Sequence, residues 1–344
     1  MSIEIVKFGR LSEEAKLLFG GKHVGFFSSI LWYQNWVDTV LLQKNEQAIF
    51  LNYTKNQKLK LLLPVKINNS CLESLTNYYS PIYYLLSSTD IEQEACLQSF
   101  FKDLRNLPLK WDTITLRAMK QEHAIFLSKL KGAGLFSLPF FCFANWYLEV
   151  RLRSFDEYFS ELPSRVRNTV TRKTKKFNKL IGTEVKIIVE GEGLEKGIKD
   201  FESVYALSWK DEESYPEFIS GLMKMASKQG ALRLGVAYIN AVPVASQFWI
   251  VADNTAYIYK LAYDEKYKKL SIGSILTATL MRHVIDVDKV SFVDYLSGDD
   301  TYKKEWMSHR RERWGIIIFN WRTFKGCLKM INEFTRFYFK KYFL

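Results

Sequence analysis

Blocks of hydrophobic and polar positions along the first half of the chain predict alternating strands and helices. Polar residues such as Thr54–Gln57 separate the apolar runs, Asp90 stands where a helix N-cap is expected, and Gly132 is placed to end a later helix. The predicted elements, in order, are strands at 47–53, 59–67 and 72–86, a helix at 90–105, a strand at 111–117, a helix at 121–131 and a strand at 140–151.

The second half repeats this alternation. Ser154 is a candidate N-cap for a helical segment that reaches Leu180, and Pro216 suits the first turn of another helix. Asn240-Ala241 and Asp253-Asn254 are short enough to form tight hairpin turns. The predicted elements after the first helical segment are a strand at 185–189, helices at 193–209 and 216–229, strands at 231–239, 242–251 and 255–262, and a last strand at 314–320.

The stretch from Tyr257 to Trp306 is the most informative part of the chain. A strand-like run leads into a polar loop with Ser271 and Gly273, a segment of helical period follows, and a second short strand is predicted at 291–296. A strand, a small-residue loop and a helix in that order can present backbone N–H groups to an anionic ligand. The sequence therefore suggests a phosphate-bearing donor as the first ligand.

The order of elements predicts an α+β, mixed-sheet fold in two similar halves that join near residue 150. No residue-by-residue repeat accompanies it, so the duplication is inferred from element order alone. A length of 344 residues accommodates two domains, and 48% hydrophobic with 25% charged residues is ordinary globular composition, not disorder.

Cysteine usage and hydropathy narrow the class of protein further. Four scattered cysteines show no metal-ligand spacing and four histidines form no paired motif, so we expect free thiols and no metal. The first residues lack the apolar core of a secretory signal, and no run of eighteen apolar residues occurs. We therefore expect a cytoplasmic protein.

Positive charge is concentrated in two segments. Residues 151–182 hold nine Lys or Arg against three acidic residues, and residues 321–344 hold six against Glu333 alone. These balances of +6 and +5 account for nearly all of the net charge of +12. Such clusters attract phosphates, nucleic acid or anionic lipid, although each is also compatible with a solvated basic helix face.

Four segments of the second half carry motifs that occur in a fixed order. They are LPSRVRNTVTRKTKKFNK, FESVYALSWK, ALRLGVAYINAVPVASQFWI, and YKKLSIGSILTATLMRHVID followed by VDYLSGDDTYKKEW. Together they resemble the GNAT-fold acyltransferases, in the branch grouped with FemAB peptidyltransferases and CelD-like proteins of bacterial polysaccharide loci. The resemblance covers roughly residues 150 to 320. It implies a GNAT-like acyltransferase domain at 151–322 and a diverged GNAT-like half at 1–150.

The resemblance also implies a binding loop for an acyl-CoA donor, because GNAT enzymes cradle the coenzyme A pyrophosphate on such a loop. The donor-binding residues expected here are Lys268, Lys269, Leu270, Ser271, Ile272, Gly273 and Ser274. Ser271 stands where the family expects a glycine. An alternative interpretation is a structural helix that the Ser271 hydroxyl caps.

The resemblance places the catalytic candidates near the end of the second half. Tyr302 is a candidate proton donor to the departing thiolate, and Lys303 is a candidate anion holder. Asp294 follows an apolar run, so its carboxylate needs a partner or a role in the site. The alternative for Asp294 is a structural ion pair with Lys303 or Lys304. Trp209, Gln247, Arg165 and Arg167 are candidate substrate contacts.

Two basic segments are each compatible with more than one binding partner. The basic helix after Pro163 suits an RNA backbone, so aminoacyl-tRNA remains an alternative donor, although no coiled-coil arm of the FemAB type is present. In the tail at 323–344, an apolar stripe (Leu328, Ile331, Phe334, Tyr338 and Tyr342) predicts a basic amphipathic helix. This helix could pack on the N-terminal half or lie at the inner face of a membrane.

The function expected from the resemblance is acyl transfer from acetyl-CoA or another acyl-CoA to an amine or hydroxyl. The acceptor would be a cell-envelope or polysaccharide precursor that could be lipid-linked. One rival function is FemAB-like aminoacyl transfer from aminoacyl-tRNA. A second rival, from another class, is a non-catalytic GNAT-fold scaffold in a polysaccharide-synthesis assembly.

Overall fold

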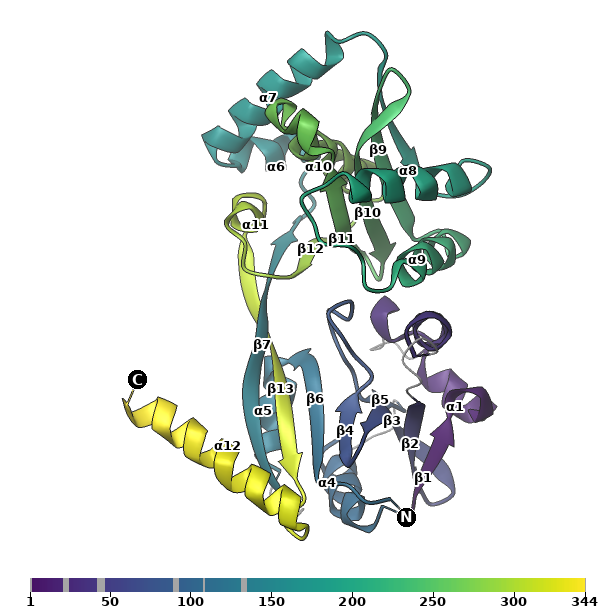
Figure 1. Cartoon of the computed structure of the whole chain (residues 1–344), viewed down its shortest axis with the longest axis vertical. Coiled ribbons are helices and arrows are strands. Elements are labelled where there is room, and N and C mark those ends of the chain that lie inside the picture. Colours follow the sequence, from purple (N-terminus) through teal and green to yellow (C-terminus); the bar gives the residue numbers. More distant parts are fainter. Residues whose placement is uncertain are drawn as a thin grey trace. The chain divides into compact units, whose positions relative to one another are not determined.

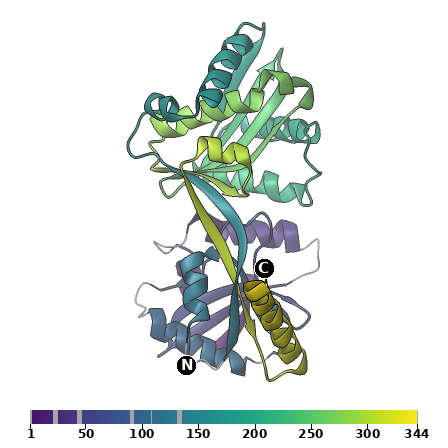
Figure 2. The same cartoon turned by 90° about the vertical axis from the view of Figure 1, so that its left-hand side faces the viewer.

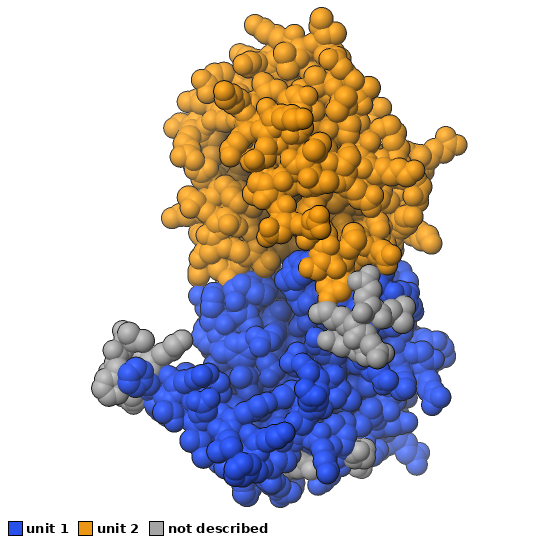
Figure 3. Space-filling model, viewed as in Figure 1, with its two compact units in different colours: residues 1–143, 312–344 blue, residues 144–311 orange. Residues whose placement is uncertain are grey.

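The computed structural model describes residues 2–20, 25–41, 47–88, 93–107, 109–130 and 135–343. They divide into two units, which Figure 3 colours separately: unit 1 comprises residues 1–143 and 312–344, and unit 2 residues 144–311. The chain leaves unit 1 within strand β7 (Phe136–Glu149) and returns to it within strand β13 (His309–Phe319).

Unit 1 is built from a sheet and helices that come from both ends of the chain (Figure 1). Its strands, besides parts of β7 and β13, are β1 (Ser2–Lys7), β2 (Ala48–Lys55), β3 (Lys58–Asn68), β4 (Cys71–Ser74), β5 (Leu86–Ser87) and β6 (Thr113–Lys120). Its α-helices are α1 (Glu13–Leu18), α2 (Ile30–Trp36), α4 (Gln93–Asp103), α5 (Gln121–Ser128) and α12 (Phe324–Phe343).

Unit 2 has a similar composition of elements. Besides parts of β7 and β13, its strands are β8 (Thr183–Ile188), β9 (Leu232–Ile239), β10 (Val242–Ala252), β11 (Thr255–Tyr263) and β12 (Phe292–Ser297). Its helices are α6 (Phe155–Glu161), α7 (Ser164–Asn178), α8 (Leu194–Ala206), α9 (Pro216–Lys228), the 3₁₀ helix η5 (Glu265–Leu270), α10 (Ile272–Arg282), the π-helix η6 (His283–Val287) and α11 (Thr301–Trp306).

The strands of the two units pair in the same order. In unit 1, β1, β2, β3 and β4 pair antiparallel in that order, β4 pairs parallel with β6, and β6 pairs antiparallel with β13. In unit 2, β8 to β11 pair antiparallel, β11 pairs parallel with β12, and β12 pairs antiparallel with β7. The predicted α+β fold in two similar halves is therefore confirmed.

The last strand of each unit, β7 or β13, is a long strand that runs from one unit into the other. Strand β7 follows unit 1 in the sequence, yet Asn145 to Glu149 pair with β12 in unit 2. Strand β13 follows unit 2, yet Arg313 to Phe319 pair with β6 in unit 1. Figure 2 shows the same two long strands in a view turned by 90° from Figure 1. Unit 1 is thus made from two stretches of sequence, whereas unit 2 is continuous from residue 144 to residue 311.

Helices cover both faces of the sheet in unit 2 (Figure 1). A Cβ on Gly197 of α8 would lie 3.1 Å from Leu234, whereas a Cβ on the next strand residue, Gly235, would lie 3.0 Å from Leu276 of α10. Successive strand residues point to opposite faces. Helices α8 and α10 therefore pack on opposite sides of β9, and small residues allow both to approach closely.

Local signals were sufficient for most elements of unit 2. Ser154 accepts from the Glu157 amide, and the Glu157 carboxylate accepts from Ser154 N in return, which is a complete capping box. Both hairpin turns have positive φ at their two central residues, with Asn240 at 49° and Asp253 at 49°. That conformation gives the twist that tight hairpins need. The predicted cap and hairpins are confirmed.

Two predictions in the first half need correction. The run 72–86 is not one strand, because only β4 and β5 form at its ends. Between them, Asn77 Oδ1 accepts from Tyr79 N at 2.9 Å, and the resulting turn stops the strand before Pro81. The helix predicted at 121–131 ends at Ser128. The predicted cap Asp90 and helix stop Gly132 lie outside the described residues.

Candidate functional site

The site of unit 2 begins where two parallel strands separate. Strand β11 pairs with β12 only from Thr255–Phe292 to Tyr257–Asp294. Beyond Tyr257, β11 continues to Tyr263 without further pairing to β12. The two strands therefore leave a wedge between their carboxyl ends, where an extended ligand can reach backbone groups.

A cavity of about 340 Å³ lies at this wedge. Five aromatic side chains form much of its wall: Trp209, Tyr263, Tyr295, Tyr302 and Trp306. The remaining lining residues come from α7, β10, β11, α10 and α11: Arg165, Val166, Thr169, Val170, Gln247, Leu261, Gly273, Ser274, Thr277 and Glu305. Segments far apart in the sequence thus build one largely apolar chamber with a few polar groups, as is usual for a small-molecule site.

The sequence-predicted site residues fall into three groups. Six of them line the cavity: Arg165, Trp209, Gln247, Gly273, Ser274 and Tyr302. Others belong to the loop that leads to it: Lys268, Lys269, Leu270, Ser271 and Ile272. The rest lie outside its wall: Asp294 and Lys303 are buried, and Arg167 is on the exposed side of α7.

The donor loop joins η5 to α10 through a left-handed residue. Ser271 has φ 52° and ψ 40°, and its side chain makes no capping hydrogen bond. The alternative in which its hydroxyl caps the helix is therefore wrong, because the left-handed backbone places the residue differently from a normal N-cap. Helix α10 still begins at Ile272. Ser274 N and Ile275 N donate to the Ser271 carbonyl at 3.0 and 3.2 Å, so the Ile272 and Gly273 amides are the first-turn donors left for a ligand among the described residues.

Two contacts hold this loop in place. Lys173 of the basic helix α7 donates to the carbonyl of Lys269. Gly273 allows close approach, because a Cβ there would lie 3.2 Å from the Tyr263 ring. Tyr263 in turn packs against Trp209, with ring centroids 4.5 Å apart. The basic helix thus positions the loop as well as presenting charge.

Gln247 is buried and fully engaged. Its Nε2 donates to the carbonyl of Gly273 at 2.9 Å and to Thr277 Oγ1 at 2.8 Å, while its Oε1 accepts from Trp249 Nε1 at 3.0 Å. These bonds tie the centre of β10 to the first turn of α10. Gln247 therefore fixes the donor loop against the sheet.

Tyr302 offers a phenol to the cavity. Its ring packs edge-on against Tyr295, with centroids 5.7 Å apart. Burial, with a further contribution from the Asp300 carboxylate, raises the pKa of Tyr302 above its usual value. The phenol stays protonated at neutral pH and can donate a proton or a hydrogen bond.

Lys303 clamps the loop after β12 and does not line the cavity. Its Nζ donates to the carbonyl of Ser297 and pairs with Asp300 at 3.2 Å. The clamp closes over Gly298, whose φ is 117° and whose added Cβ would lie 2.6 Å from Lys303 Nζ. This geometry gives Lys303 a structural role, with Ser297 and Asp300 as its partners in place of the Asp294 that the sequence suggested.

Asp294 is buried in a hydrogen-bonded network. Its carboxylate accepts from Asn145 Nδ2 at 2.6 Å, from Leu296 N at 2.7 Å and from the Arg311 guanidinium. The sequence-based alternative paired Asp294 with Lys303 or Lys304, and this is wrong because its cationic partner is Arg311. The network connects β7, β12 and β13 and supports the interruption in β12 pairing between Asp294 and Ser297.

Lys210 follows Trp209 of the cavity wall but does not itself line the cavity. Its ammonium lies 5.8 Å from the Trp209 ring and 5.6 Å from the Tyr205 ring. Burial, with the nearby Lys260 charge, lowers its pKa to about 8. No regular motif marks such a residue, since the shift arises from groups brought together by the fold.

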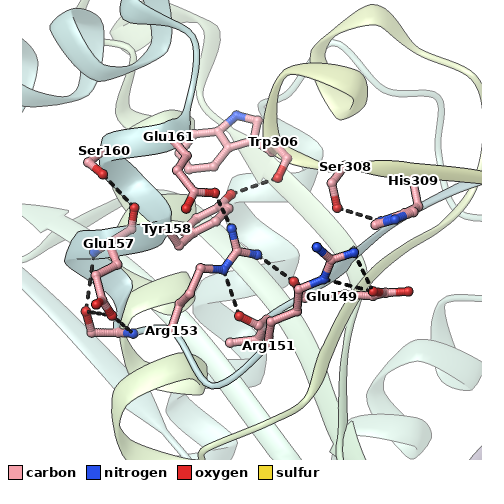
Figure 4. A network of polar contacts seen from close by, with 12 residues as sticks. Glu149, Arg151, Arg153, Glu157, Tyr158, Ser160, Glu161, Trp306, Ser308 and His309 are labelled. Atoms are coloured by element: carbon pink, nitrogen blue, oxygen red, sulfur yellow. Dashed lines mark hydrogen bonds and ion pairs between the residues drawn. The ribbon is translucent and has the colours of Figure 1, made fainter.

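The far side of the chamber is braced by polar contacts from α6 and α7. Figure 4 shows Tyr158 OH donating to the carbonyl of Trp306 at 2.8 Å, beside Arg153, whose Nε donates to Val150 O at 2.8 Å. Arg165 pairs with Glu305 at 3.1 Å across the cavity wall. Helix α7 buries an apolar stripe at Val166, Val170 and Phe177.

A family comparison agrees with this geometry. Residues 164–304 match the family model described as an acetyltransferase (GNAT) domain. Unit 2 carries a GNAT acyltransferase domain. The match contains α7, the donor loop and the wedge and ends within α11, so it covers every cavity-lining residue except Glu305 and Trp306. No curated protein matches this chain in sequence.

Solved structures extend the likeness of fold to both units. FemX aligns with a TM-score of 0.61 at 9% identity, covering 94% of this chain and 100% of FemX. A conserved protein of unknown function from Bacteroides thetaiotaomicron gives 0.57 at 9% identity, covering 84% and 90%. L-PGS from Bacillus licheniformis gives 0.52 at 9% identity, covering 82% and 87%. The GNAT-like fold that the sequence predicted is thus confirmed.

Proposed function

We propose that this GNAT-domain protein transfers an acyl group from a coenzyme A thioester to an amine or hydroxyl of a cell-envelope or polysaccharide precursor. The observation that carries the proposal is the cavity at the β11–β12 wedge, with the N-terminal turn of α10 in its wall. In this proposal the first turn of α10 would hold a phosphate group, and the neighbouring chamber would hold the reacting end of the donor.

The donor would bind through backbone groups. The first-turn amides of α10, with the positive end of the helix dipole, favour a pyrophosphate, and Lys268 and Lys269 come just before them. The pantetheine arm carries amides, which can pair with β11 beyond Tyr257, where its pairing with β12 ends. The thioester would then lie in the aromatic chamber.

The chemistry needs one proton acceptor and one proton donor. The acceptor nitrogen or oxygen attacks the thioester carbonyl carbon, the new C–N or C–O bond forms, and the C–S bond breaks. Lys210, in its neutral form, would take the proton that the nucleophile loses, and Tyr302 would give a proton to the departing thiolate. Fixed geometry then supplies much of the rate increase.

Calorimetry with acetyl-CoA tests the donor. We expect measurable heat at millimolar ligand, and Gly273→Glu should abolish it, because a carboxylate would stand in the phosphate cradle. The matched control is Gly193→Glu, at an exposed glycine with nothing within 4 Å of an added Cβ. Circular dichroism verifies folding of both variants. Unchanged affinity in Gly273→Glu would show that the loop has a structural role only.

A second candidate donor is aminoacyl-tRNA, and one observation favours it. The exposed side of α7 displays Arg167, Arg172, Lys175, Lys176 and Lys179, a surface that could follow a phosphate backbone. If acetyl-CoA gives no heat while tRNA binds tightly, this donor replaces coenzyme A. If neither ligand binds, a non-catalytic scaffold becomes the better proposal.

A further inference from the structure

Helix α12 exposes more apolar surface than a solvated helix needs. Phe324 is 80% exposed, Phe339 58%, Ile331 54% and Leu328 51%. Large contiguous apolar patches are uncommon on monomeric soluble proteins and mark interaction sites. The exposed apolar surface of α12 is therefore a candidate interaction site.

This exposure is not the result of an undocked helix. Thr323 Oγ1 donates to Asp112 Oδ1 at 2.6 Å and accepts from Gly326 N at 3.0 Å, which secures the start of α12 to unit 1. Gly326 packs so closely that an added Cβ would lie 2.2 Å from the Asn320 carbonyl. Figures 1 and 2 both draw α12 in yellow at the side of unit 1.

The helix has separate inner and outer apolar faces. On the inner face, Phe334 lies 6.1 Å from the Phe319 ring and 6.5 Å from the Phe136 ring. On the outer face, Phe324, Leu328 and Ile331 recur at spacings of 4 and 3 and form one stripe, whereas Tyr338 packs against Phe334. Packing on unit 1, the first of the two predicted arrangements, thus accounts for the inner face and leaves the outer stripe uncovered.

A basic stripe runs beside the outer apolar stripe. Lys325, Lys329 and Arg336 recur at spacings of 4 and 7, about 100° around the helix axis from the apolar stripe. Glu333 is the only acidic residue of the segment 321–344, which carries six Lys or Arg. A groove of about 610 Å³ beside Phe136, with an almost wholly apolar wall, adds further apolar surface next to the helix.

We propose that α12 docks unit 1 on an anionic phospholipid surface, with its outer apolar stripe in the acyl boundary and its lysines and arginine among the headgroups. Aromatic rings with polar edges suit this boundary, and long basic side chains keep their charge in the polar layer. A second copy of the chain fits less well, because facing helices would bring two strongly positive segments together.

Vesicle co-sedimentation of the full chain tests the proposal. We expect binding to vesicles of phosphatidylcholine with 30% phosphatidylglycerol to be at least tenfold tighter than binding to phosphatidylcholine alone. The variant Leu328→Asn/Ile331→Asn should weaken binding at least tenfold. Lys325→Gln/Arg336→Gln should weaken it about 25-fold, at about fivefold per charge.

Matched controls use unit 1 surfaces away from α12. Leu17→Asn, at a 76% exposed leucine, and Lys16→Gln should both bind like the parent protein. Turnover of soluble substrates should stay unchanged in the α12 variants, so failure here is distinct from failure of the proposed activity. Equal binding by all variants, or no vesicle binding, would overturn the proposal. Self-association of the parent protein that Leu328→Asn/Ile331→Asn abolishes would assign the stripe to a second copy.

Discussion

Arg311 pairs with Asp294 and thereby neutralises the buried carboxylate at the base of the unit 2 wedge. The guanidinium also donates from Nε to Asn145 Oδ1 at 2.5 Å, and it lies 4.4 Å from the Tyr147 ring. Only 2% of the Asp294 side chain is exposed, whereas 40% of the Arg311 side chain is. One residue of β13 thus completes a site whose other members lie on β7 and β12.

Removing this guanidinium should destabilise unit 2. Arg311→Ala leaves the Asp294 carboxylate without a counter-ion, and breaking a buried pair in this way costs about 3 kcal/mol. Arg151→Ala is the control, because the Arg151–Glu149 pair is exposed and should contribute less than about 1 kcal/mol. Urea unfolding midpoints compare the two. Similar small losses in both variants would show that Asp294 is held by its other hydrogen bonds.

Alanine substitutions at two glycines distinguish the cost of backbone strain from the cost of disturbing the Lys303 clamp. Gly298→Ala should destabilise unit 2 by more than Gly191→Ala, because only the former brings a Cβ near Lys303 Nζ and Asp300. Both glycines have positive φ, at 117° and 88°, so each alanine incurs a backbone penalty of about 1 kcal/mol or more. Urea unfolding measures the difference. Equal losses would mean that the clamp adjusts without cost.

The sequence predicted the parts of the site that depend on neighbours along the chain. The capping box at Ser154 and the turn at Asn240 are local devices, so their residues alone specify them. The position of Tyr302 could also be predicted from the sequence, since a motif places it after a strand. Of these, α11 contributes Tyr302, Glu305 and Trp306 to the cavity wall.

Contacts between residues far apart in the sequence could not be predicted from local patterns. Asn145 and Asp294 hydrogen-bond across 149 positions of sequence, and the exchanged strands β7 and β13 bring Arg311 to them. Nothing in the spacing of residues indicates which cation will reach a buried carboxylate. The same holds for the lowered pKa of Lys210, which depends on burial and on Lys260.

The left-handed Ser271 predicts an unusual result for a loop substitution. Ser271→Gly should stabilise the protein by about 1 kcal/mol, because glycine adopts φ 52° without the steric cost that serine incurs. Ser274→Gly, inside the first turn of α10, should instead destabilise by about 0.5 kcal/mol. Thermal unfolding tests both. A loss of stability in Ser271→Gly would show that the serine hydroxyl makes a compensating contact.

Substitution of Tyr302 tests its proposed part in proton transfer. Tyr302→Phe should lower kcat about 100-fold with little change in KM, because the departing thiolate loses its proton donor while the ring remains in the wall. Steady-state kinetics with acetyl-CoA measure both constants, and Tyr267→Phe, outside the cavity wall, is the control. A changed KM with constant kcat would instead assign the phenol to ligand binding.

The lowered pKa of Lys210 predicts how kcat/KM should change with pH. Because that pKa is lowered to about 8, the lysine is protonated below pH 8 and becomes a base only as the pH rises through this value. With hydroxylamine as acceptor, which is itself neutral at pH 7, kcat/KM should rise about tenfold per pH unit and level off above about 8. Lys210→Arg should lower kcat/KM at least about 100-fold and remove this rise, since arginine stays charged.

Lys304→Arg is the matched control for the Lys210 experiment, because Lys304 is exposed on α11. Its profile should coincide with that of the parent protein. A rise near pH 8 that persists in Lys210→Arg would assign the titration to another group and leave Lys210 as a charge beside the Trp209 wall. A flat profile in the parent protein would show that the nucleophile loses its proton directly to water.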